Sequence, residues 1–174
     1  MAVPPGSYRV RLIVTQPGTD AGGQVQHEVL VPPLDGANPG ISDVVVGRRG
    51  EGPVWMDRGD SIPVNAVSAY PQGSALALYY EVHGLTAGTH YRARIEVIRE
   101  GRGGFLGLFR GKRTPVSLEF DGVSEGEPTR VTQTVNVGDL AAGHYRLAVS
   151  VTPTGSDARH TRVVSFSITS RRAG

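Results

Sequence analysis

The chain has 174 residues, a formal net charge of +2 and no cysteine. Its length allows one domain, or one and a fraction, with a sizeable core. The missing cysteine excludes a disulfide framework, a thiolate metal site and a thiol nucleophile, and so small a charge does not by itself indicate nucleic-acid binding. The 24 glycines and 12 prolines fall between runs rich in valine, isoleucine, leucine and tyrosine, which is typical of an all-β protein rather than a disordered one.

Apolar residues at every second position predict a series of strands along the chain. Residues 7–15 and 24–32 are expected to form a hairpin, and Pro32-Pro33 ends it because proline cannot donate to a strand ladder. A polar, glycine-rich stretch without strands is expected between residues 47 and 60. The strand at 61–70 contains a proline and is therefore expected at a sheet edge. The remaining strands are predicted at residues 42–46, 76–82, 91–98, 116–121, 129–137, 145–152 and 161–169.

The beginning and the end of the chain repeat one another. The stretch Gly6-Ser-Tyr-Arg-Val-Arg-Leu-Ile-Val-Thr15 matches Gly143-His-Tyr-Arg-Leu-Ala-Val-Ser-Val-Thr152 at a constant offset, and the match continues into the strand that follows each. A looser third copy begins at Gly88. The first hairpin therefore resembles the last two strands of another sandwich whose first strands are missing. Because a lone hairpin is marginal in water, it must add to the edge of the resident sandwich, pair with a second chain or be completed by further sequence.

These elements predict an all-β fold, an immunoglobulin-like or fibronectin III-like antiparallel β-sandwich with an additional N-terminal β-hairpin. We expect the hairpin, a partial sandwich repeat, at residues 1–33, a connector at 34–42, the sandwich at 43–170 and a tail at 171–174. Almost no helix is expected, because no apolar pattern of helical spacing extends over three turns.

Two turns that end in glycine each precede a tyrosine, at Tyr91 and at Tyr145. In immunoglobulin-like sandwiches a tyrosine just after such a corner donates a hydrogen bond back to the loop. The glycine accepts a backbone geometry that a side chain would forbid. We therefore interpret these tyrosines as structural rather than as a platform on which a ligand stacks.

Three stretches carry a family resemblance: Ile41-Ser-Asp-Val-Val-Val46, Ala69-Tyr-Pro-Gln-Gly-Ser-Ala-Leu-Ala-Leu-Tyr-Tyr-Glu-Val-His-Gly-Leu85, and the Gly-x-Tyr-Arg strand pairs. Together they resemble the C-terminal β-region of bacterial GWxTD-domain proteins, in which a Ser-Asp-apolar strand and a Tyr-x-Glu-Val-x-x-Leu strand are flanked by Pro-Gly-x-Tyr hairpins. The resemblance covers most of the chain, although the Gly-Trp-x-Thr-Asp motif that names the family is absent. It implies the fold and a bacterial envelope-associated role, and it implies no enzymatic chemistry.

The strongest candidate contact is a basic apolar loop within residues 99–113. Five cationic side chains and one carboxylate surround two phenylalanines and two leucines set among glycines. An apolar tip with a basic collar suits a membrane interface or a membrane-protein partner. The alternative is that the apolar residues cap one end of the sandwich while the arginines are solvated. The residues predicted to dock are Arg102, Phe105, Leu106, Leu108, Phe109, Arg110, Lys112 and Arg113.

Catalytic and metal-binding patterns are weak. No two of the five histidines stand at a metal-ligand spacing on one predicted strand, and no Gly-x-Ser-x-Gly elbow occurs. Glu81 and Glu96, on neighbouring predicted strands, could form an acid pair like that of glycosidases, but outward carboxylates on an antiparallel sheet explain them more simply. We therefore expect no enzymatic activity, no cofactor and no metal.

The expected function is that of a non-enzymatic structural or interaction subunit that docks on a larger bacterial protein assembly. The basic apolar loop and strand addition at a β-edge would make the contacts, with a membrane surface or a membrane protein as one candidate target. The alternative is a ligand-binding accessory module, such as a carbohydrate-binding sandwich, that uses Trp55, Tyr70 and Tyr79. A nucleic-acid partner is not expected, because basic and aromatic residues are not interleaved over a face.

The N-terminus has neither a basic nor an apolar region of the kind found in signal peptides, and no stretch approaches ~18 uninterrupted apolar residues. We therefore expect the chain in the cytoplasm or at the cytoplasmic face of a membrane, or in the envelope or periplasm if it is part of a longer or processed form.

Overall fold

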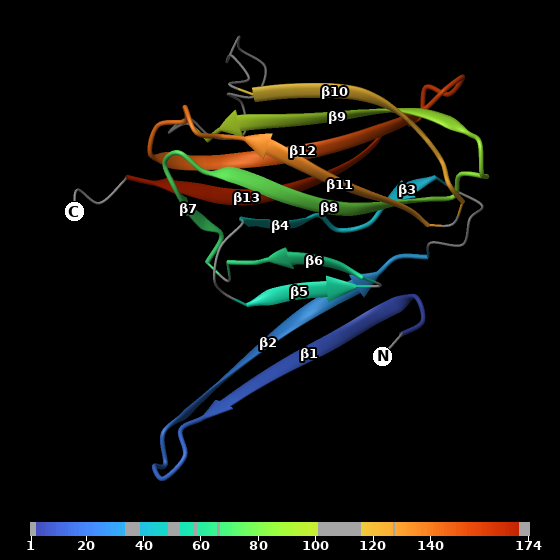
Figure 1. Cartoon of the computed structure of the whole chain (residues 1–174). Helices are drawn as coiled ribbons and strands as arrows, with labels where there is room; N and C mark the ends of the chain where they lie inside the picture. The colour runs from blue at the N-terminus through green and yellow to red at the C-terminus, as the bar shows by residue number, and fades with distance from the viewer. Residues whose placement is uncertain are drawn as a thin grey trace. The chain divides into compact units, whose positions relative to one another are not determined.

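A computed structural model describes residues 3–33, 39–48, 53–57, 59–65, 67–100, 116–126 and 128–170. The described residues form strands and turns and no helix, which confirms the all-β fold class (Figure 1). The chain divides into two compact units, Met1–Asp35 and Gly36–Gly174. The first contains a two-stranded hairpin and the second contains the remaining strands.

The larger unit contains a five-stranded sheet in the order β10-β9-β12-β13-β7. Neighbouring strands are antiparallel, except that β7 runs parallel to β13. The strands are β7 (Ala69–Pro71), β9 (His90–Arg99), β10 (Val116–Val123), β12 (Gly143–Pro153) and β13 (His160–Thr169).

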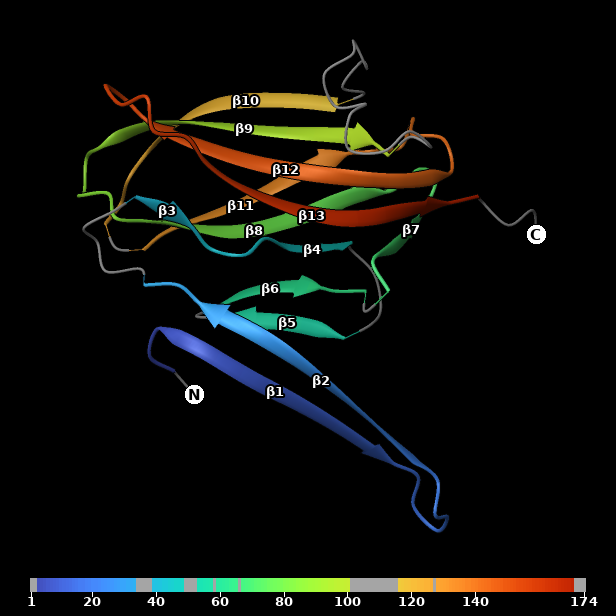
Figure 2. The same ribbon diagram turned by 180° about the vertical axis from the view of Figure 1, so that it is seen from behind.

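A second sheet lies against the first, as the views from both sides show (Figures 1 and 2). Its order is β11-β8-β3, and β4 also pairs with β8. Every pairing in it is antiparallel. The strands are β3 (Gly40–Ile41), β4 (Val45–Arg48), β8 (Ala75–His83) and β11 (Thr129–Asn136).

The core lies between these two sheets and follows the two-residue period of the sequence. Alternate residues of β8 and of β12 are fully or almost fully buried, and they belong to one apolar cluster with residues of β9, β11 and β13. From β8 and β12 these residues are Leu76, Leu78, Tyr80, Val82, Tyr145, Leu147, Val149 and Val151. The two sheets therefore share a single sandwich core.

β5 (Val54–Asp57) and β6 (Asp60–Pro63) form a small two-stranded sheet, and β5 occupies a part of the chain that was expected to hold no strand. It lies beside β4, where Gly47 forms a bridge with Val64. A Cβ at Gly47 would collide with the backbone of Pro63 and the side chain of Ile62, so only glycine allows this approach. The Ile62 side chain is buried.

The strand predicted at 61–70 is divided between two sheets, which corrects the sequence prediction. Residues 60–63 belong to β6 and residues 69–71 belong to β7. A turn separates them, in which the Ser68 amide donates to the Asn65 carbonyl at 2.9 Å and the Asn65 side chain donates to the Ala69 carbonyl at 2.7 Å. Ser68 has a φ of 46°, a conformation that ends regular pairing.

The smaller unit is a regular hairpin of β1 (Gly6–Thr15) and β2 (Gly22–Val31), paired antiparallel along their whole lengths. This confirms the two strands predicted from the sequence, with slightly longer bounds. Its pairing places mostly apolar side chains, together with His27, on one face, and mostly polar side chains, together with Ile13 and Leu30, on the other. The apolar side chains are Tyr8, Val10, Leu12, Val14, Val25 and Val29, which we call the hairpin apolar face.

Candidate interaction surface

The residues predicted to dock on a partner lie outside the described residues. The segment that holds them joins Arg99 at the end of β9 to Val116 at the start of β10. β10 is an edge strand of the five-stranded sheet and β9 is its neighbour. The docking role of this loop therefore stays a prediction for Arg102, Phe105, Leu106, Leu108, Phe109, Arg110, Lys112 and Arg113.

The β1–β2 hairpin has the same register as the β12–β13 hairpin of the sandwich. The constant offset seen in the sequence carries nine of the ten pairs of facing residues in the β1–β2 hairpin onto pairs of facing residues in the β12–β13 hairpin. Equivalent pairs are Gly6↔Val31 with Gly143↔Ile168, and Tyr8↔Val29 with Tyr145↔Phe166. The sequence repeat is therefore also a structural repeat.

The turn before each hairpin is repeated as well. The Tyr8 hydroxyl donates to the Pro4 carbonyl at 2.7 Å, and the Tyr145 hydroxyl donates to the Ala141 carbonyl at the same distance. Gly6 and Gly143 open the strands with φ values of 154° and 155°. The expected corner hydrogen bond is thus present at Tyr145, and an equivalent one exists in the hairpin.

Tyr91 was expected to form the same corner and lies differently. Its ring occupies the space beside Gly122 of β10, where an added Cβ would collide with it. Burial raises the pKa of the Tyr91 hydroxyl above its ordinary value, and the nearby Glu125 carboxylate adds to this effect. Tyr91 therefore packs an edge strand onto its neighbour.

The two hairpins differ in what covers their apolar faces. In the sandwich, Leu147 and Val149 are 0% exposed. Their counterparts in the hairpin, Val10 and Leu12, are 52% and 58% exposed. A row of apolar side chains that is buried in one copy is thus open in the other, which marks the hairpin apolar face as a candidate contact surface.

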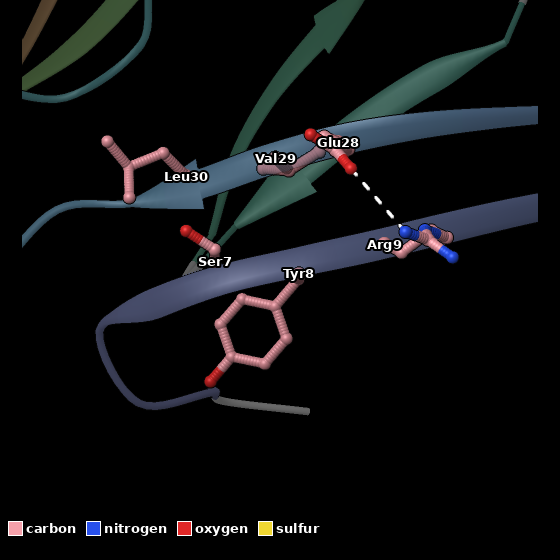
Figure 3. A pocket seen from close by; sticks show the side chains of 6 residues that line it. All are labelled: Ser7, Tyr8, Arg9, Glu28, Val29 and Leu30. Carbon is pink, nitrogen blue, oxygen red and sulfur yellow. Dashed lines mark ion pairs between the residues drawn. The ribbon is translucent and has the colours of Figure 1, made fainter.

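The opposite face of the hairpin is mainly polar, although Ile13 and Leu30 also lie on it. Arg9 lies across from Glu28, with their charged groups 3.6 Å apart, and both side chains are well exposed. An exposed ion pair of this kind contributes little stability. Figure 3 shows Tyr8 directed away from the side on which Ser7 and Leu30 lie. An open hollow of about 460 Å³ is lined by Ser7, Tyr8, Arg9, Glu28, Val29 and Leu30.

A polar cluster lies on the outer face of β8. The Tyr79 hydroxyl donates to Glu81 at 2.8 Å, and the other carboxylate oxygen of Glu81 lies 3.1 Å from Nε2 of His83. The Trp55 ring lies 4.7 Å from the Tyr79 ring. Burial raises the pKa of Tyr79, and the hydrogen bond to Glu81 raises it further. The cluster therefore holds Tyr79 in its neutral, hydrogen-bonded form.

The aromatic side chains expected to bind a sugar do not form a common exposed surface. Tyr70 is 0% exposed and donates to the Val46 carbonyl at 3.1 Å. Tyr79 is 3% exposed beneath the half-buried Trp55. Tyr70 and Tyr79 are thus interior residues, because other parts of the protein cover both faces of the strands that carry them.

Glu81 and Glu96 do not lie on neighbouring strands, which corrects the sequence prediction. Glu81 is in β8 and Glu96 is in β9, and these strands belong to different sheets. Glu96 pairs with Arg94 at 3.1 Å and with Arg159 at 3.5 Å. The chain crosses from one sheet to the other between these strands, so their carboxylates have separate partners.

Within the described parts of the chain, no group of three or more histidine, aspartate or glutamate side chains is placed to hold a metal ion. The same residues include no helix of the length and apolarity needed to span a membrane. No family model matches the sequence. A search of curated proteins finds no significant match.

Proposed function

We propose that this chain is a non-enzymatic structural or interaction subunit that docks on a larger bacterial protein assembly, and that the hairpin is one of its contacts. The observation that carries the proposal is the open hairpin apolar face, whose counterpart in the sandwich is buried. Burying one valine or leucine side chain contributes about 1.5–3 kcal/mol. A partner that covers several such side chains therefore gains substantial free energy.

Strand addition is the second part of the proposed contact. Among the described residues, β1 and β2 pair only with each other. Each therefore has an outer edge of backbone donors and acceptors along its length, which is the feature that a partner strand recognises. Hydrogen bonds along this edge would orient the partner, while the hairpin apolar face would supply most of the binding energy.

The basic apolar loop is the second proposed contact, with a membrane surface or a membrane protein as its target. Its sequence supports this role, because four large apolar residues stand among five cations. The resemblance to the C-terminal region of GWxTD-domain proteins agrees with a bacterial assembly, and it stays a prediction. The assignment to immunoglobulin-like sandwiches also stays a prediction, supported by the Tyr145 corner.

The test is purification of the tagged full chain from its own cells, compared between two neighbouring substitutions. Leu12 and Ile13 are 58% and 61% exposed, but only Leu12 belongs to the hairpin apolar face. We expect Leu12→Asp to lose a stoichiometric partner that Ile13→Asp retains. Replacing residues 103–110 by Gly-Ser repeats tests the loop separately. A chain that is recovered alone under all conditions would contradict the proposal.

A further inference from the structure

We infer that the hairpin is the closing strand pair of a second β-sandwich, whose remaining strands are supplied by a partner polypeptide. This inference rests on the proposed function and specifies the partner's chemistry. The partner would be a β-domain that lacks its last two strands, with an open apolar sheet face and an open strand edge. The β12–β13 pair of the larger unit shows what such a partner must provide.

The covered face of β12 and β13 defines the first requirement. Leu147 and Val149 are buried in the same apolar cluster as Leu78 and Tyr80 of the facing strand β8. The hairpin repeats the register, the corner hydrogen bond and the opening glycine of β12–β13, so its side chains alternate in an equivalent pattern, with His27 at the position of Val164. The partner therefore needs an apolar sheet that covers the hairpin apolar face, as β8 and β11 cover the apolar face of β12 and β13.

The paired edges of β12 and β13 define the second requirement. β12 pairs antiparallel with β9 from Tyr145↔Arg99 to Pro153↔Tyr91, and β13 pairs in parallel with β7. The equivalent edge of β1 begins at Tyr8. The partner is therefore expected to place a long antiparallel strand beside β1 and a short parallel strand beside the end of β2.

One difference between the two hairpins distinguishes the partner from the strands of this chain. In the sandwich, the Phe166 ring stacks on Tyr145 at 5.6 Å and meets Tyr70 edge-on at 6.3 Å. Its counterpart in the hairpin is Val29, which is much smaller. A partner sheet that fits the hairpin must fill this volume with a side chain of its own, because an empty space there would weaken the packing.

A second copy of the hairpin is a poorer occupant. The face of two ten-residue strands is about 33 Å long and about 10 Å wide, a footprint of roughly 330 Å². Stable interfaces bury about 800 Å² on each partner. Two hairpins packed face to face would also leave both outer strand edges open or pair only one of them. A partner that supplies both a facing sheet and a neighbouring strand meets both needs.

The probe for this inference is the sandwich without its own closing strands, residues 39–141, co-expressed with the tagged full chain. The full chain should carry Val29→Phe, which restores the aromatic side chain that this particular acceptor normally receives from Phe166. We expect the acceptor to co-purify with the V29F chain. Adding Leu12→Asp should reduce capture about tenfold or more, because a charge would enter an apolar interior. Adding Ile13→Asp should leave capture unchanged.

Capture that does not depend on Leu12 would show exchange of β12–β13 and would overturn the inference. Binding of the acceptor to a tagged segment of residues 142–170, but not to the V29F chain, would also overturn the inference. If the acceptor binds neither, a chimera decides, in which residues 6–32 with V29F replace residues 143–169 of the full chain. Cooperative unfolding of the chimera supports the inference, and loss of the folded sandwich overturns it.

Light scattering on the full chain distinguishes a partner polypeptide from a second copy. A monomer is expected, whereas a dimer that Leu12→Asp dissociates would overturn the assignment to a partner. These results are independent of the cellular purification. A chain that captures the acceptor but has no cellular partner would contradict the proposed function and the partner polypeptide with it, while the fit of the hairpin to an open sandwich would stand.

Discussion

The two hairpins of this protein have the same backbone arrangement but lie in different environments. β1–β2 and β12–β13 agree in register, in the corner hydrogen bond and in the conformation of the opening glycine. One is the centre of a sandwich, and the other forms a separate unit with an exposed apolar face. The comparison teaches that the backbone of such a hairpin follows from local sequence, whereas the stability that it contributes depends on the sheet packed against it.

The largest difference is expected from truncation at equivalent core positions. Leu147 is 0% exposed, so Leu147→Ala should lower the free energy of unfolding of the sandwich by about 2–5 kcal/mol. Val10→Ala, at the equivalent position of the hairpin, should change it by less than about 0.5 kcal/mol. Urea unfolding followed by the fluorescence of Trp55, the single tryptophan, measures both. A similar loss of unfolding free energy in the two variants would show that the two positions are equally buried, which would contradict the comparison.

An intermediate effect is expected at the glycines that open the hairpins. Gly143 has a φ of 155°, and an added Cβ would lie 3.2 Å from a guanidinium nitrogen of Arg99. Gly143→Ala should therefore destabilise the sandwich by about 1–3 kcal/mol. Gly6→Ala should leave the unfolding midpoint of the sandwich unchanged and speed hydrogen exchange of the β1 amides instead. A shifted sandwich midpoint in Gly6→Ala would show that the two units unfold together.

The smallest effect is expected from the corner hydroxyls. Tyr145→Phe leaves the ring in the core and removes its hydrogen bond to Ala141, which should cost about 1 kcal/mol. Tyr8→Phe removes the equivalent bond to Pro4 in an exposed setting, where water replaces it, so no measurable change is expected. Chemical denaturation of both variants beside the wild type tests the pair. An equal cost at Tyr8 would mean that its corner is buried in the full chain.

The strands that alternate regularly were predicted well because each has one side facing a core. The strands at 76–82 and 145–152 were found with bounds extended by one or two residues. β5 was missed because Val54–Asp57 is short, lies in a glycine-rich stretch and has three consecutive apolar residues rather than an alternating pattern. The division of 61–70 was missed because it depends on contacts that the local pattern does not show. The Asn65 side chain bonds to the Ala69 carbonyl, and residues 69–71 pair with residues 167–169 of β13 in another sheet.

The candidate surface was partly visible in the sequence. The internal repeat predicted that the hairpin resembles a strand pair of a sandwich, and the alternation predicted which of its faces is mostly apolar. The acid pair of Glu81 and Glu96 was misplaced, because strands that follow one another along a chain were assumed to be neighbours in one sheet. The burial of Tyr70 and Tyr79 could not be predicted from alternation, since residues on both faces of these strands are covered.

The sequence by itself determined the strand period, the repeat and the residues that share a face, because these depend on side-chain alternation and on turns made by neighbouring residues. The tertiary structure decided which strands became neighbours, which tyrosines were buried and which of two equivalent hairpins received a covering sheet. These outcomes depend on contacts between segments far apart in the chain. A short pattern of apolar residues specifies that a face should be buried and leaves open which surface buries it.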